Sequence, residues 1–160
     1  MDHILIENFN QVLKEKELTI AFAESITAGM LCSSIASVSG ASSILKGGLV
    51  TYDEKLKTKL LRVRESTLEK FTAESLQTTI EMALGLQQLD VGANINVAIT
   101  GVASEPTNNY SITASVGDVF VAVSFNNNMF TEKFNLRGER NEIREQAVEA
   151  TLKFILKVIA

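Results

Sequence analysis

Apolar side chains recur at two different spacings along the chain, and the two spacings predict its elements. Repeats of three and four residues predict amphipathic helices, because such positions share one helix face. Helices are expected on this basis over 2–16, 27–38, 53–61, 72–89 and 138–159. Short apolar runs bounded by glycine or small polar residues predict strands over 18–23, 47–52, 95–101, 117–125 and 130–136.

The order of these elements predicts an α/β fold. Helices alternate with strands early in the chain, which favours parallel pairing, and Asn126-Asn127-Asn128 joins the last two strands as a hairpin signal. We therefore expect a single domain over 1–160, a three-layer α/β/α sandwich with a mixed β-sheet. Ligands of open α/β sheets bind at the carboxyl ends of strands. The turns after Ala23, Tyr52 and Thr100 are thus expected to share one site.

Composition narrows the classes of function. The 160 residues, 46% of them hydrophobic, suffice for one core, and the formal net charge of −4 has no basic run that would favour nucleic-acid binding. The longest apolar stretches are too short to span a bilayer, and the N-terminus lacks the order of a signal peptide. One cysteine cannot form an internal disulfide. We expect a cytoplasmic protein that binds neither nucleic acid nor membrane.

The stretch Ala23-Glu24-Ser25-Ile26-Thr27-Ala28-Gly29 lies between a predicted strand and a predicted helix. A serine in such a turn can attack a carbonyl carbon, and nearby backbone N–H groups can stabilise the resulting oxyanion. The simpler alternative is that Ser25 or Thr27 only caps the helix that follows. The rest of the chain has to decide between the two.

A nucleophilic serine needs a base, and the only histidine, His3, lies at the chain start. Lys57 is a candidate, because it lies about one turn into a predicted helix beginning near Asp53. The positive end of the helix dipole, together with partial burial, would lower the pKa of its amine. Tyr52 could relay a proton or orient the substrate. Alternatively, Lys57 is one of several solvent-facing lysines on that helix, and Tyr52 is an ordinary aromatic residue at a strand end.

Several turns could bind an anion. Ser42 belongs to the small-residue turn 39–43, Thr100-Gly101 ends a strand, and Arg140 opens the last helix. Ordinary turn chemistry or surface charge explains each of them equally well. The irregular stretch 102–115 has the length of a binding loop. No Walker motif, dinucleotide fingerprint or metal-binding motif is present in the sequence.

The ordered motifs together resemble those of a known family. They are Ala23-Glu24-Ser25-x-Thr27-x-Gly29, Gly40-x-Ser42, Gly48-x-Val50-x-Tyr52-x4-Lys57, Thr100-Gly101, Val116-Gly117 and Gly138-x-Arg140. In this combination the chain resembles the C-terminal domain of the competence-damage-inducible protein CinA over nearly its whole length. On this resemblance we expect that domain alone, without the molybdopterin-binding-like domain that precedes it in full-length CinA.

The resemblance implies an activity and roles for particular residues. Members of the family include amidohydrolases that deamidate nicotinamide mononucleotide, without a metal or other cofactor in this domain. By resemblance, Ser25 is the nucleophile, Tyr52 and Lys57 assist it, and a homodimer is expected. The residues expected around the small-molecule nucleotide substrate are Glu24, Thr27, Gly29, Ser42, Thr100, Gly101 and Arg140.

The sequence also departs from the family pattern. Ile26 stands where the family has cysteine, and Ala28 where it has a first glycine, so a Cβ would oppose a positive φ there. The loop 102–115 lacks the family's glycine pair and Lys-Pro, and it carries Glu105 instead. Two alternatives therefore stay open: a catalytically impaired nucleotide-binding or regulatory domain, and an interaction module on the same fold.

Overall fold

The computed structural model describes residues 1–107 and 110–160. Asn108 and Asn109, which belong to the predicted loop 102–115, lie outside the described residues. The elements are α1 (His3–Glu15), β1 (Ile20–Glu24), α2 (Met30–Ala36), η1 (Ala41–Ser43), β2 (Leu45–Val50), α3 (Glu54–Leu61), α4 (Glu65–Phe71), α5 (Leu76–Gln88), β3 (Ile95–Gly101), β4 (Asp118–Phe125), β5 (Asn128–Asn135) and α6 (Arg140–Val158).

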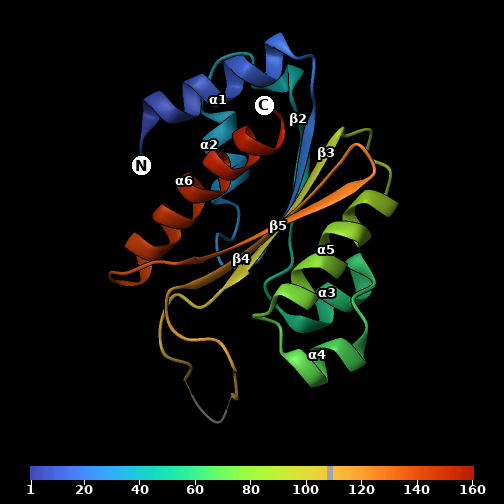
Figure 1. Cartoon of the computed structure of the whole chain (residues 1–160), viewed down its shortest axis with the longest axis vertical. Helices are drawn as coiled ribbons and strands as arrows, with labels where there is room; N and C mark the ends of the chain where they lie inside the picture. Colours follow the sequence, from blue (N-terminus) through green and yellow to red (C-terminus); the bar gives the residue numbers. More distant parts are fainter. Residues whose placement is uncertain (108–109) are drawn as a thin grey trace.

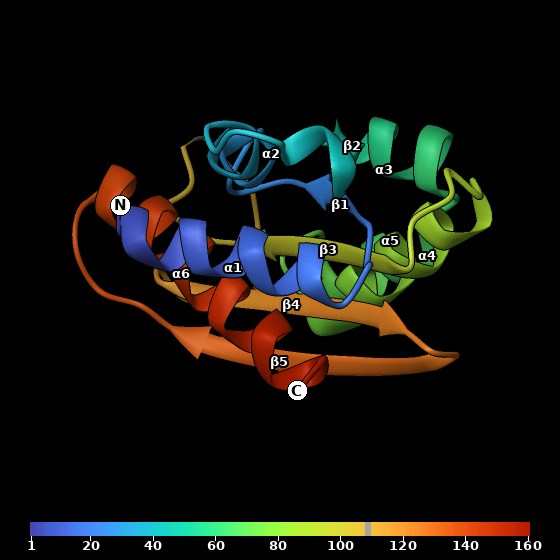
Figure 2. The ribbon, with the colours of Figure 1, turned by 90° about the horizontal axis from the view of Figure 1, so that it is seen from above.

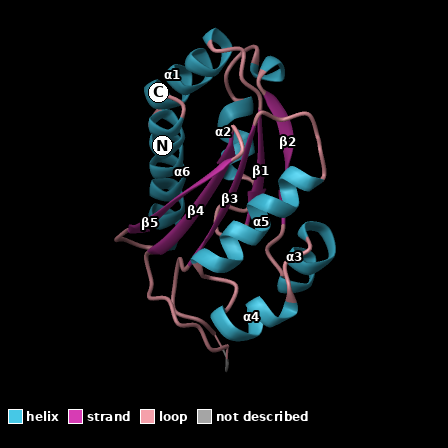
Figure 3. Cartoon of the chain, turned by 45° about the vertical axis from the view of Figure 1, so that its right-hand side comes forward, coloured by secondary structure: helices cyan, strands magenta, loops and turns pink. Residues whose placement is uncertain are grey.

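One mixed sheet of five strands organises the molecule, in the order β2-β1-β3-β4-β5. Strand β1 pairs in parallel with both β2 and β3, whereas β3, β4 and β5 pair antiparallel (Figure 3). The parallel part comes from the alternating early elements and the antiparallel part from the late hairpin. The predicted α/β fold with a mixed sheet is confirmed.

Helices cover both faces of the sheet. Helices α1, α2 and α6 lie on one face, and α3, α4 and α5 lie on the other (Figures 1 and 2). The first face carries large side chains such as Phe22 and Val121, while the second carries alanines such as Ala21 and Ala98. Small side chains on the second face let α5 pack closely against the strands. Alternation along each strand, with a period of two, separates the two cores.

The hairpin turn is tighter than the sequence indicated. Strand β5 begins at Asn128, so only Asn126 and Asn127 connect it to β4. Both have positive φ angles, 49° and 60°. Asparagine tolerates this left-handed conformation, and two such residues make the turn that fits the twist of a hairpin.

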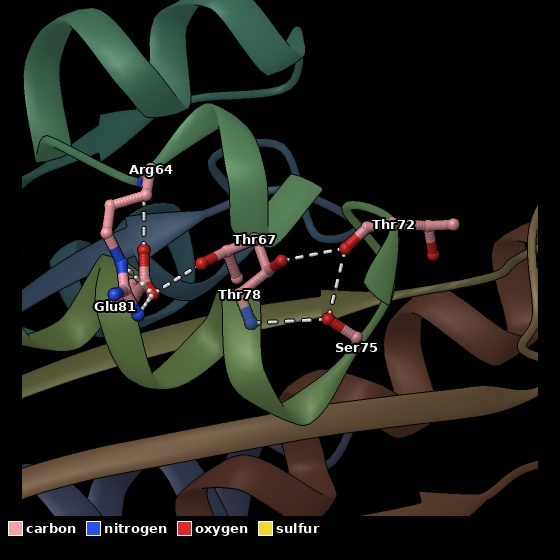
Figure 4. Close-up of polar contacts among 6 residues, drawn as sticks. All are labelled: Arg64, Thr67, Thr72, Ser75, Thr78 and Glu81. Carbon is pink, nitrogen blue, oxygen red and sulfur yellow. Dashed lines mark hydrogen bonds and ion pairs between the residues drawn. The ribbon is translucent and has the colours of Figure 1, made fainter. Parts of the chain in front are cut away.

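Helix α4 was not predicted, because its seven residues show no clear apolar period. Its position depends instead on contacts with Glu81 of α5 (Figure 4). The Glu81 carboxylate accepts hydrogen bonds from the backbone N–H of Arg64, from the Arg64 guanidinium and from Thr67 Oγ1, at 2.5–2.9 Å. A carboxylate remote in sequence thus takes over the capping that α4 lacks locally.

The three parallel strands end side by side. In the register of the sheet, Glu24 at the end of β1 pairs with Val50 of β2 and with Ile99 of β3. The turns that follow these strands therefore meet at one edge, as the topology predicts. Within the described residues, none of the helices combines the length and apolar character needed to cross a bilayer.

Candidate active site

A cavity of about 640 Å³ opens at this carboxyl edge of the sheet. It is bounded by the turn after β1, the start of α3, the turn before α5, the loop after β3 and the start of α6. Side chains or backbone that line it include those of Ser25, Tyr52, Glu74, Gly101, Tyr110 and Arg140. The sequence had placed four of these six in one site.

Ser25 is the first residue after β1, and its backbone N–H donates to Ile99 O at 3.1 Å. Its carbonyl closes a turn by accepting from Ala28 N at 3.1 Å. Among residues 1–107 and 110–160, the N–H groups of Ile26 and Thr27 have no hydrogen-bond acceptor. Open N–H groups directly after a serine are candidates for stabilising an oxyanion formed at that serine.

Glu24 stabilises the end of this turn and the start of α2. Its carboxylate accepts hydrogen bonds from the backbone N–H groups of Gly29, Leu31 and Cys32, at 2.9, 3.1 and 3.0 Å. These are the open donors at the start of a helix, and a negative charge there is favourable. Helix α2 consequently begins at Met30 rather than at residue 27. Glu24, only 1% exposed, caps a helix and does not line the cavity.

Arg144 of α6 fixes the same turn from outside. Its Nε donates to Ile26 O at 2.9 Å, and a terminal nitrogen donates to Thr27 O at 3.1 Å. Because Ile26 O points toward Arg144, the Thr27 N–H in the same peptide plane is held in a fixed direction. This position of Arg144 could not be predicted from local sequence, since more than a hundred residues separate it from the turn.

Lys57 reaches Ser25 from α3. The helix begins after Asp53, whose side chain accepts from Lys55 N at 2.8 Å. The Lys57 amine lies 3.0 Å from Ser25 Oγ, 2.5 Å from Thr51 O and 3.2 Å from Tyr52 O. Lys57 is 1% exposed.

The two carbonyls determine what the amine can do. Carbonyl oxygens only accept, so Thr51 O and Tyr52 O each take an N–H of Lys57. The third direction points at Ser25 Oγ. When Lys57 is neutral, its lone pair therefore faces the serine hydroxyl, which is the geometry of a general base.

Burial makes the neutral amine accessible. Loss of solvation lowers the pKa of Lys57 from 10.5 to about 8, against the opposing influence of Glu74, Glu54 and Asp53, whose negative charges raise it. At pH 7 roughly a tenth of the molecules then carry a neutral Lys57. The solvent-facing alternative holds for Lys55 and Lys59, which are exposed, but not for Lys57.

Tyr52 contributes in two separate ways. Its backbone carbonyl accepts from Lys57, whereas its side chain extends along the cavity and is 56% exposed. The Tyr52 hydroxyl accepts a hydrogen bond from Arg140 at 2.8 Å, and Arg140 also donates to Ser104 Oγ at 2.7 Å. This trio places a guanidinium at one end of the cavity, where it can bind an anionic group.

Other residues predicted for the site lie close to it but under its surface. Thr100 is 1% exposed and shares a 2.7 Å hydrogen bond with Thr79 of α5. Thr27 Oγ1 is buried and has no hydrogen-bond partner within the described chain. Gly101 does line the cavity, and a Cβ there would lie 2.7 Å from Asp118 O, so only glycine fits.

Ser42 is not brought to the cavity. It lies on η1, which precedes β2, and it is exposed in a separate hollow lined by residues 36–42 and Leu45. A segment before a parallel strand lies at the amino edge of the sheet, opposite the carboxyl edge. The topology therefore separates Ser42 from Ser25.

The two substitutions in the nucleophile turn are accommodated differently. Ala28 has a φ of 47°, so it does adopt the left-handed conformation that its Cβ disfavours, at a strain of order 1 kcal/mol. Gly29, at φ 97°, follows it as the N-cap of α2. Ile26 is 5% exposed, packs into the core and also borders the cavity.

Comparison with known proteins identifies the family of the chain. The family model of the CinA C-terminal domain matches residues 2–159. The chain belongs to the CinA family. A CinA-like protein of Thermotoga neapolitana is 42% identical over 147 residues, which are 92% of this chain and 35% of the relative. A CinA-like protein of Flavobacterium psychrophilum is 36% identical over 158 residues, 99% of this chain and 37% of the relative.

Solved structures of CinA proteins share the fold. The competence/damage-inducible protein CihA of Agrobacterium tumefaciens has a TM-score of 0.90 at 29% identity, over 99% of this chain and 95% of that one. A competence or damage-inducible protein of Enterobacter asburiae has a TM-score of 0.90 at 28% identity, and the match covers 99% of this chain and 98% of that one. The chain spans little more than a third of the length of the curated relatives it matches.

Proposed function

We propose that this CinA domain is an amidohydrolase that converts nicotinamide mononucleotide and water to nicotinate mononucleotide and ammonia. The observation that carries the proposal is the 3.0 Å contact between the buried Lys57 amine and Ser25 Oγ, in a cavity open to a ligand. A nucleophile in hydrogen-bond reach of a base whose pKa is lowered is the arrangement for acyl transfer.

In the first half of the reaction, neutral Lys57 accepts the proton of the Ser25 hydroxyl as Oγ bonds to the amide carbon. The amide oxygen becomes negatively charged and accepts from the open N–H groups of Ile26 and Thr27. The Lys57 ammonium then gives its proton to the amide nitrogen, the C–N bond breaks, and ammonia leaves. An ester between Ser25 and the nicotinate carbonyl remains.

In the second half, water attacks the ester. Lys57, neutral again, accepts a proton from the water as its oxygen bonds to the carbonyl carbon, and the same N–H groups stabilise the oxyanion. Lys57 returns the proton to Ser25 Oγ as the ester bond breaks. Throughout, Thr51 O and Tyr52 O hold the amine on the axis toward Ser25. No proton is lost or gained by the protein over the cycle.

A second part of the cavity, around Arg140, suits the remainder of the nucleotide. Arg140, held by Tyr52 and Ser104, offers a guanidinium for the substrate phosphate. Tyr52 accepts from Arg140 and can donate its own proton to a ligand oxygen. We assign Tyr52 and Arg140 to substrate binding and orientation.

One observation favours a second candidate, a nucleotide-binding domain without turnover. The described part of the loop after β3 brings Glu105, a negative charge, to the cavity edge. It supplies no lysine or arginine for a phosphate, which leaves Arg140 and Lys55 as the cations that line the cavity.

The decisive experiment measures ammonia release from nicotinamide mononucleotide. Wild type should release ammonia and nicotinate mononucleotide in equal amounts, and Ser25→Ala should lose at least 10³-fold in rate. Ser33→Ala, which removes an exposed hydroxyl from neighbouring α2, is the matched control and should keep full activity. Ligand-induced stabilisation without any product in wild type would instead establish the second candidate.

A further inference from the structure

The ionised side chains that line the cavity are unevenly distributed. Acidic residues outnumber basic ones, and three of the four acidic residues lie at the start of α3 or in the turn before α5. The acidic lining residues are Asp53, Glu54, Glu74 and Glu105, and the basic ones are Lys55 and Arg140. The cavity thus has a cationic end and a more strongly anionic wall.

Two of the carboxylates meet at one atom. Tyr110 OH lies 2.7 Å from an oxygen of Glu54 and 3.4 Å from an oxygen of Glu74. A phenol has one proton and can donate to only one carboxylate at a time. Within residues 1–107 and 110–160, neither Glu54 nor Glu74 forms an ion pair. We call these two residues the acidic wall.

The position of Glu74 is set by its backbone. The flanking Thr72 has a φ of 65°, which is strained for a β-branched residue, and its carbonyl accepts from Ser75 Oγ at 3.0 Å and Thr78 Oγ1 at 2.7 Å (Figure 4). Ser75 also caps α5 by accepting from Thr78 N at 3.2 Å. These bonds stabilise the turn that carries Glu74, which lines the cavity, and burial of its carboxylate raises its pKa.

The proposed chemistry removes the positive charge of buried Lys57 near this wall. Protonated Lys57 offsets part of the negative charge of Glu54 and Glu74. As a general base, Lys57 must be neutral. The reactive state therefore leaves two carboxylates in a partly buried place without a compensating cation, an arrangement that favours binding of a positive group.

We infer that the acidic wall selects a ligand whose amide-bearing ring is positively charged, while Arg140 receives its anionic end. The inference rests on the proposed function and refines it, since the pyridinium ring of nicotinamide mononucleotide is a cation and its phosphate is an anion. On the proposed function, the contact of Lys57 with Ser25 places the amide of the ligand in this cavity. A ring attached to that amide lies in the same cavity as Glu54 and Glu74, and charges interact over several ångströms where solvent is partly excluded.

Ligand charge can be varied with almost no change of shape. The 1,4-dihydro form of nicotinamide mononucleotide keeps the amide, ribose and phosphate but has a neutral ring. Binding is measured by calorimetry in the Ser25→Ala background, where no turnover interferes. We expect the oxidised, cationic form to bind about tenfold more tightly than the dihydro form.

Variants of the wall locate the source of this preference. Glu74→Gln and Glu54→Gln should each reduce the preference several-fold, chiefly by weakening the cationic ligand. Tyr110→Phe keeps both carboxylates and removes the hydrogen-bond donor that competes for them, so the preference should be retained or increased. Glu69→Gln, which removes an exposed charge from α4, is the control and should change nothing.

The outcomes separate the inference from the proposed function. Turnover of the mononucleotide without any charge preference, or a preference unchanged in both Gln variants, overturns the acidic wall and leaves the function standing. A second pair, cationic 1-methylnicotinamide and neutral nicotinamide, tests the wall without a phosphate. Cation preference there without nucleotide turnover supports the wall and rejects the function. Equal or absent binding of both forms in both pairs overturns the inference.

Discussion

At the scale of single residues, the site depends on one lysine that the protein buries. Lys57 has three hydrogen-bond partners, and two of them are carbonyls that leave only the third direction for proton exchange with Ser25. Lys55 and Lys59, two residues away on either side, are exposed. Of these three lysines only Lys57 is buried, and burial makes its amine a candidate base.

Replacing Lys57 tests this role. Lys57→Met should lower kcat by about 10³-fold, the contribution of a general base. Lys57→Arg should be as inactive, because a guanidinium stays protonated even where it can donate to the same carbonyls. Rates of ammonia release measure both, with Lys59→Met as the control that keeps activity. Substantial activity in Lys57→Arg would show that the residue acts only as a cation.

The same pKa predicts the pH dependence of the rate. Because Lys57 must be neutral and its pKa is lowered to about 8, kcat/KM should increase with pH below 8 and level off above it. Removing the wall charge in Glu74→Gln lowers that pKa further, so the rising limb should move to lower pH. A profile that falls between pH 6 and 8 contradicts the assignment.

The lowered pKa of Lys57 should also make the free energy of unfolding depend on pH. Lys57 has a pKa of about 8 when folded and about 10.5 when unfolded, so between these values the unfolded chain binds more protons. The free energy of unfolding therefore gains from Lys57 as pH rises through this window, by on the order of a few kcal/mol. Urea unfolding of wild type and Lys57→Met should give a difference that changes with pH from 8 to 10.5, and a constant difference would refute it.

At the scale of elements, close helix packing brings Lys57 to Ser25. Gly85 of α5 lies against the end of α3, where a Cβ would be 1.9 Å from Leu61 O. The absence of a side chain lets the two backbones touch. The position of α3, and of the lysine that it carries, thus depends on a glycine nearly thirty residues further along the chain.

Gly85→Ala should therefore impair both stability and activity. The added methyl group must displace α3, at a cost on the order of 3 kcal/mol. We expect a lower midpoint of thermal unfolding and, in the remaining folded protein, a reduced kcat. Leu84→Ala changes an outward-facing neighbour that is 42% exposed and should do neither to a comparable extent. An unchanged rate in folded Gly85→Ala would show that α3 can shift without affecting the site.

The elements also show where prediction from sequence stops. The strands at the carboxyl edge could be predicted, because periodicity is a local property, whereas the pairing of Ser25 with Lys57 was expected from the resemblance of the ordered motifs to the family. Helix α4 could not, since Glu81 of another helix stabilises its start. Ser42 fits an anion-binding turn in composition, but strand direction places it at the other edge of the sheet. Glu74 and Tyr110 belong to no motif and meet only in the folded chain.

At the scale of the whole molecule, different segments form the core and the cavity. The buried strands β1, β3 and β4 form the centre of the sheet. The cavity is formed mainly by segments that lie beyond the carboxyl ends of the parallel strands. Arg144 and Arg140 of the last helix bring the chain end back to turns formed near its beginning. Because these contacts join segments far apart in the sequence, the site forms only when the whole domain is folded.

Hydrogen exchange can map this arrangement. Nicotinamide mononucleotide should slow amide exchange in segments at the carboxyl edge, namely 25–29, 51–57, 101–104 and the start of α6, because a ligand there reduces local opening. Segment 39–45 at the amino edge should not change, and it serves as an internal control. Protection of 39–45 instead would place the ligand beside Ser42.

The most direct test of the central claim asks whether Lys57 activates Ser25, whatever the true substrate is. A fluorophosphonate reacts with activated serines, and peptide mass spectrometry identifies the modified residue. Wild type should be labelled at Ser25, at a rate that rises with pH and levels off above about 8, while Lys57→Met should be labelled far more slowly at every pH below 9. Labelling of Ser25 at the same rate in both proteins, or labelling elsewhere in preference to Ser25, would contradict the account.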